Sequence, residues 1–124
     1  MAAEEELATA RHLAGGDFHA ATCFHCQQAA EKAVKSVHYA RGARAVLGHS
    51  VRALIESLEP RDEGLDDLLD AARELDLLYV PTRYPNGLAA GTPGAAFSAA
   101  QAERAIAHAE AVVRAARRAS DVDR

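Results

Sequence analysis

The side chains best suited to chemistry lie in a proline-rich stretch, YVPTRYPNG, at residues 79–87. Its two prolines fix the backbone beside Arg83 and Tyr84, so both side chains have little conformational entropy left to lose. Arginine offers a fork of donors that suits a phosphate group, and tyrosine offers a ring on which a base can stack. These residue types indicate contact with a nucleotide or RNA. The alternative is a rigid connection between helices, in which Arg83 caps a helix C-terminus or pairs with Asp76.

A second candidate is His49, in the tripeptide GHS at residues 48–50. The reference pKa of histidine lies near neutrality, so His49 is suited to act as a general base. Histidines in such connections also order the chain through ring hydrogen bonds, and that alternative stays open.

Polar side chains also follow one side of a predicted helix, at Gln27, Gln28, Glu31, Lys32 and Lys35. One interpretation is a solvated stripe in which Glu31 and Lys35 form an i,i+4 ion pair. The other is that the stripe borders a groove and that Lys32 or Lys35 faces a phosphate group.

Two cysteines, Cys23 and Cys26, form a C-x-x-C pair within the same predicted helix. A redox pair of this kind follows a strand at a helix N-terminus, where the thiol pKa falls, and neither condition is met here. Together with His19, the pair offers a metal three ligands at most. We therefore expect buried free cysteines that act as small apolar residues, and neither a metal nor a cofactor.

Glycine and proline divide the rest of the chain into helices. The predicted helices cover residues 3–14, 18–41, 51–58, 65–79 and a last one that begins at Ser98. Asp17 and Ser50 are expected to cap the second and third helices, and Ser98 forms a capping box with Gln101. The second helix is apolar over more than half its circumference, so it is expected to be central. With no strand pattern, the sequence predicts an all-α up-down bundle of about five helices.

The composition fits one domain, residues 1–124, which includes a Pro/Gly-rich loop at 80–97. Hydrophobic residues make up 49% and aromatic residues 5%, so we expect a thin aliphatic core that favours association with a second chain. The net charge of −4 argues against non-specific binding of a phosphate backbone, but not against a local basic site. The acidic start does not resemble a secretory signal, and no apolar run is long enough to span a membrane, so a soluble cytoplasmic protein is expected.

Three motifs resemble those of the HEPN domain family, whose name stands for higher eukaryotes and prokaryotes nucleotide-binding. They are CQQAAEKAVK at residues 26–35, GHS at 48–50, and LD at 75–76 followed by YVPTRYPN at 79–86. The resemblance covers nearly the whole chain. It implies an up-down helical bundle that forms a two-fold homodimer with a role around nucleotides or RNA. Many small prokaryotic members are encoded beside a minimal nucleotidyltransferase, and some are the toxin of a toxin–antitoxin pair.

Ribonuclease members of the wider superfamily carry an Arg, then four to six residues, then a His, and they cleave RNA without a metal. Arg83 lies in the corresponding loop, but the matching positions 88–90 hold leucine and alanine, which transfer no proton. Arg44 and His49 have the four-residue spacing, but they precede the third helix, so we treat this match as accidental. The resemblance therefore favours a non-catalytic or weakly active member.

The resemblance implies a binding site for a nucleotide or RNA phosphate, made of Arg83, Tyr84, Asn86, Lys32 and Lys35. In this site Arg83 holds phosphate, Tyr84 stacks or donates a hydrogen bond, and Asn86 bonds a base or orders the turn. Two alternatives stay open. One is a metal-independent endoribonuclease in which Arg83 stabilises charge and His49 is the base. The other is a purely structural dimerisation module.

Overall fold

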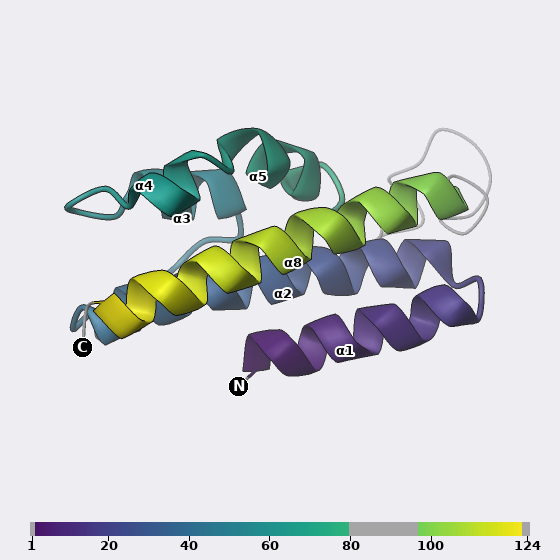
Figure 1. Ribbon diagram of the computed structural model, residues 1–124, viewed down its shortest axis with the longest axis horizontal. Helices are drawn as coiled ribbons and strands as arrows, with labels where there is room; N and C mark the ends of the chain where they lie inside the picture. Colours follow the sequence, from purple (N-terminus) through teal and green to yellow (C-terminus); the bar gives the residue numbers. More distant parts are fainter. Residues whose placement is uncertain (1, 80–96, 123–124) are drawn as a thin grey trace.

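The computed structural model describes residues 2–79 and 97–122, most of which lie in helices. The helices, labelled as in Figure 1, are α1 (Ala2–Gly15), α2 (His19–Ala40), α3 (Val51–Glu56), α4 (Glu63–Asp66), α5 (Leu69–Asp76) and α8 (Ala99–Val122). No strand occurs within the described ranges, and the predicted all-α class is confirmed.

The three long helices, α1, α2 and α8, run side by side (Figure 1). The most extensive contacts of α2 are with α8 and α1, which confirms the prediction that the second helix is central. In Figure 1 the short helices α3, α4 and α5 lie away from α1, on the other side of the long helices. There α5 packs against α3, α8 and α2. This arrangement brings the connection between α2 and α3 close to the C-terminal end of α5.

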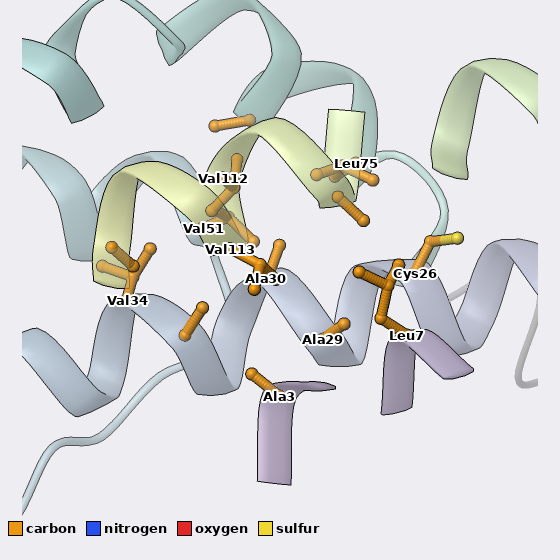
Figure 2. Close-up of a cluster of buried hydrophobic side chains, with 14 of the residues drawn as sticks. Ala3, Leu7, Cys26, Ala29, Ala30, Val34, Val51, Leu75, Val112 and Val113 are labelled. Carbon is orange, nitrogen blue, oxygen red and sulfur yellow. The ribbon is translucent and has the colours of Figure 1, made fainter. Parts of the chain in front are cut away.

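Small aliphatic side chains fill the space between the helices. Ala29, Ala30 and Val34 of α2 are fully buried. The side chains around them in Figure 2 come from α1, α3, α5 and α8: Ala3, Leu7, Val51, Leu75, Val112 and Val113. Because alanine and valine bury little apolar area each, the stability of the core is spread over many small contacts. The expected aliphatic core is confirmed.

Two predicted helix starts are confirmed in detail. The Ser50 side chain accepts a hydrogen bond from the Ala53 amide and caps α3. At the start of α8, the Ser98 hydroxyl accepts from the Gln101 amide at 3.2 Å, and the Gln101 side chain accepts from the Ser98 amide at 2.8 Å. These reciprocal bonds form the expected capping box.

The predicted N-cap role of Asp17 is wrong. Asp17 has a left-handed backbone with φ of 64°. Its amide donates to the carbonyl of Ala14, and the amide of Phe18 donates to the carbonyl of Leu13. These two bonds form a Schellman motif, which satisfies the last carbonyls of α1. Asp17 therefore ends α1, and Phe18 occupies the N-cap position of α2 without a side-chain cap.

The predicted helix 65–79 is also wrong in its bounds, because two shorter helices replace it. The Asp62 carboxylate accepts from the Leu65 amide at 2.8 Å and starts α4 two residues earlier. The Leu68 amide then bonds the Leu65 carbonyl, a tighter i,i+3 turn that ends α4. The chain resumes as α5, so that Leu65 and Leu75 are both fully buried.

Within the described residues, every helix is too short or too polar to cross a lipid bilayer.

Candidate functional site

The polar side of α2 is partly buried, which the solvated-stripe interpretation does not allow. Gln27 is 0% exposed and Glu31 is 5% exposed. Each buried polar group therefore requires a partner. Lys35 Nζ donates to Glu31 Oε2 at 3.1 Å, so the predicted ion pair is confirmed. Gln27 Nε2 donates to Glu31 Oε1 at 3.2 Å.

His49 completes this cluster from the connection between α2 and α3. Its Nδ1 lies 3.2 Å from Glu31 Oε1, and its main-chain carbonyl accepts from Gln27 Nε2 at 2.9 Å. A carboxylate beside Nδ1 favours the tautomer with the proton on Nδ1, which leaves Nε2 as an acceptor. Nε2 has no hydrogen-bond partner among the described residues, and the side chain is 59% exposed. We name Gln27, Glu31, Lys35 and His49 the Glu31 cluster.

Asp76, at the end of α5, fixes the backbone that follows His49. Its carboxylate accepts from the Ser50 hydroxyl at 2.7 Å, from the Val51 amide at 2.6 Å and from the Arg52 amide at 3.2 Å. Two of these donors are backbone amides at the N-terminus of α3, where a negative charge is favourable. Asp76 thus holds the start of α3, and with it the position of His49.

An aromatic stack joins the Glu31 cluster to the segment that follows α5. The rings of His49 and Tyr79 are nearly parallel, with centroids 4.8 Å apart and an interplanar angle of 13°. On α2, Phe24 stacks against Tyr79 with centroids 6.4 Å apart. The stack therefore contains one ring from each of three chain segments.

Lys32 has a different partner from Lys35. Its Nζ donates to Glu6 Oε1 of α1 at 2.5 Å, and His25 Nδ1 lies 2.6 Å from Glu6 Oε2. Burial alone would raise the pKa of Glu6, but the hydrogen bonds and charges of Lys32 and His25 outweigh it, so the pKa of Glu6 is lowered. The structure thus brings Lys35 into the Glu31 cluster and ties Lys32 to α1.

Three predicted binding residues, Arg83, Tyr84 and Asn86, lie outside the described residues. Tyr79 and Phe97 are the described residues that flank this segment. The alternative partner suggested for Arg83, Asp76, has both carboxylate oxygens bonded to the start of α3.

The two cysteines are free and completely buried, as expected. Burial raises the pKa of Cys23 to about 11 and that of Cys26 to about 12, so both thiols are protonated at neutral pH and are poor nucleophiles. Across the described ranges, no group of three or more His, Cys, Asp or Glu side chains is placed to hold a metal ion.

A separate cavity of about 270 Å³ lies between α5 and α8. Its wall includes Leu77, Phe97, Gln101 and Arg104, together with His108, which is paired with Glu74. None of these residues was identified from the sequence as part of a site. Two further roles were not predicted from the sequence: Asp76 anchors α3, and Tyr79 stacks on His49. The polar residues at positions 27, 31 and 35, spaced by four on one helix, were the signal for a cluster of side chains that contact one another.

The comparison that decides the family is a match to the HEPN domain model over residues 1–119. The chain belongs to the HEPN domain family. Three solved structures share this fold. One is TT1696 from Thermus thermophilus, which is 35% identical to this HEPN domain with a TM-score of 0.89. The match covers 95% of this chain and 92% of that one.

The other two solved structures are named as HEPN proteins. ST0689, an archaeal HEPN homologue, is 31% identical with a TM-score of 0.75, and the match covers 93% of this chain and 88% of that one. The HEPN domain protein tm0613 from Thermotoga maritima is 37% identical with a TM-score of 0.72, covering 94% and 92%. No functionally curated protein matches this HEPN domain.

Proposed function

We propose that this HEPN domain binds a nucleotide or RNA phosphate, with the Glu31 cluster, which includes Lys35, acting together with the predicted residues Arg83, Tyr84 and Asn86. The single observation that supports it best is the Glu31 cluster itself. A buried carboxylate holds a lysine and an exposed histidine together, and the histidine stacks on Tyr79, which shortly precedes Arg83 in the chain. Lys32 joins the proposed site as a second cation on the same helix, paired with Glu6.

The distribution of charge supports the same proposal. From Glu31 to Glu56 the chain carries five Lys or Arg residues against the two terminal Glu residues, a formal charge of +3, although the net charge of the protein is −4. This stretch forms the second half of α2, the connection that carries His49, and α3. A local excess of positive charge attracts phosphate groups even on an acidic protein.

The proposal includes a homodimer that works with a minimal nucleotidyltransferase in a toxin–antitoxin pair in the cytoplasm. The partner and the dimer are carried over from what the resemblance to the HEPN family implies. The fully buried free cysteines fit a reducing compartment. Light scattering coupled to gel filtration is expected to give twice the mass of one chain.

The deciding experiment is calorimetric titration with a short single-stranded oligouridylate. We expect Arg83→Ala to weaken binding at least about tenfold, because a charge-assisted contact contributes roughly 1.5–3 kcal/mol. Arg73→Ala is the matched control, since Arg73 is exposed and pairs with Asp70 on α5. Equal affinities for the wild type and Arg83→Ala would reject the site. If the wild type neither binds nor shows a rise in melting temperature with the oligonucleotide, the domain is a structural dimerisation module.

A second candidate, a metal-independent endoribonuclease, is favoured by one specific observation. The Glu31 carboxylate orients His49 through Nδ1, and the opposite nitrogen is placed to accept a proton. RNA cleavage in the presence of EDTA that disappears in both His49→Ala and Arg83→Ala would support this candidate. Absence of cleavage by the wild type would reject it.

A further inference from the structure

The aromatic stack of Phe24, Tyr79 and His49 ends at the protein surface. Phe24 and Tyr79 are half-buried, whereas the His49 side chain is 59% exposed. Tyr79 covers one face of the imidazole at a centroid distance of 4.8 Å. The exposed area of the ring therefore lies away from Tyr79, where a further flat ring can continue the stack.

The imidazole is held in place before any ligand arrives. Glu31 bonds its Nδ1, Gln27 bonds its main-chain carbonyl, and Tyr79 supports its face. A ring that is already fixed loses little entropy when a ligand stacks on it. An exposed histidine with no such supports would lose more.

The surroundings indicate the chemical class of the ligand. Lys35 shares Glu31 with His49, and the exposed Arg44 lies in the same connection. A planar ring that shares a carboxylate with a lysine, on a connection that also carries an arginine, fits a nucleobase attached to a phosphate. In a duplex both faces of a base are covered by its neighbours, so only an unpaired base can stack on a side chain. Every base has a flat face, so this contact is tolerant of sequence.

We propose that His49 is the terminal stacking platform for one unpaired nucleobase of a bound RNA strand, extending the stack of Phe24, Tyr79 and His49. This inference rests on the proposed function, since it names how the same site recognises RNA. It assigns to His49 a binding role that does not require proton transfer.

The test uses a short single-stranded oligouridylate with one internal 2-aminopurine, whose fluorescence is quenched by stacking. Wild-type protein is expected to quench the probe. His49→Ala is expected to remove most of the quenching and to weaken binding about tenfold, as for the loss of one stacked base. His49→Phe keeps a flat ring and loses the imidazole nitrogens, so it is expected to retain the quenching and to bind within about threefold of the wild type.

Leu47→Ala is the matched control, because Leu47 lies in the same connection and is 89% exposed. It is expected to leave quenching and affinity unchanged. Thermal melting of each variant checks that the fold is kept, and the same probe annealed to its complement is expected to show no quenching by the protein.

The outcomes separate the two proposals. If His49→Ala binds and quenches like the wild type, the platform is rejected and the proposed RNA binding stands. If His49→Phe is as defective as His49→Ala, the imidazole nitrogens and not the ring face are responsible, and the platform is rejected. If quenching depends instead on Arg104, the base occupies the cavity between α5 and α8, which also rejects it. If wild-type protein binds no probe, both proposals fail.

Discussion

Two carboxylates of this HEPN domain each bind one lysine and one histidine, yet they serve different purposes. Glu6 of α1 binds Lys32 and His25, which both belong to α2, so the contact joins two long helices. Glu31 of α2 binds Lys35 of its own helix and His49 of a connection. The residue types are the same in both places, so they do not by themselves distinguish a structural contact from a site.

The contacts of Glu6 and Glu31 differ in the element that carries the histidine. His25 is fixed on a helix, and its side chain is 29% exposed. His49 lies on a connection anchored by Asp76, stacks on Tyr79, and is twice as exposed. A held but accessible ring suits ligand binding. A ring packed between two helices suits the stability of the fold.

The largest expected difference between the two carboxylates is in stability. Glu31→Ala removes the acceptor of Lys35 and one of the two acceptors of Gln27, in a largely buried place, and is expected to lower the free energy of unfolding by about 2–3 kcal/mol. Glu6→Ala is expected to lower it by about 1 kcal/mol, because the Glu6 side chain is 20% exposed and water replaces it more readily.

Urea unfolding of the two variants measures this difference. Glu5→Ala, at an exposed position of α1, is the control and is expected to change the free energy of unfolding by less than about 0.5 kcal/mol. If Glu6→Ala and Glu31→Ala lose the same free energy of unfolding, the burial of Glu31 does not determine how much it contributes to stability.

A smaller difference is expected in RNA binding. Lys35→Gln keeps a donor for Glu31 but removes the charge, and we expect oligouridylate binding to weaken about fivefold with a shallower salt dependence. Lys32→Gln is expected to weaken it less than about twofold, because Lys32 pairs with Glu6 of α1 and does not belong to the cluster that holds His49. Fluorescence anisotropy at several salt concentrations measures both. If Lys32→Gln weakens oligouridylate binding more than Lys35→Gln does, the phosphate binds on the side of α2 that faces α1.

The smallest expected effect is the pH dependence of stability that Glu6 contributes. Its pKa in the folded protein is lowered from the ordinary value of 4.5. Its contacts therefore contribute stability above pH 4.5 that is lost as the pH falls through the folded-state pKa. The difference in unfolding free energy between the wild type and Glu6→Gln is expected to stay constant near neutral pH and to shrink below pH 4.5. Urea unfolding between about pH 3 and 7 measures it, and a difference that persists at the acidic end would contradict the assignment.

Features set by neighbouring residues were predictable from the sequence. The caps at Ser50 and Ser98 depend on partners three residues away, and both were expected. The role of Asp17 was not expected. Aspartate is common both at helix starts and at helix ends with a left-handed backbone, and Asp17 occupies the second kind of position. The break between α4 and α5 depends on an early cap at Asp62 and on the burial of two leucines against other helices.

In the candidate site too, local contacts were predictable from the sequence and contacts between distant residues were not. The Glu31–Lys35 pair is local and was predicted, whereas the burial of Glu31 depends on a connection that lies 18 residues further along the chain. The anchoring of α3 by Asp76 spans a greater distance and carries no local signal. The roles of Arg83, Tyr84 and Asn86 stay predictions, since these residues lie outside the described ranges.

The alanine-rich seam of α2, made of Ala29, Ala30 and Ala33, limits which substitutions this sequence can accept in evolution. Ala29, Ala30 and Ala33 are fully buried where α2 meets its neighbours. A change to glycine at such a position adds backbone freedom and costs about 1 kcal/mol, while a larger side chain overfills the seam and costs about 1–3 kcal/mol. Substitutions at exposed positions such as Leu47 are therefore expected to be tolerated during evolution. At Ala29, Ala30 and Ala33, selection is expected to retain alanine, one of the smallest side chains.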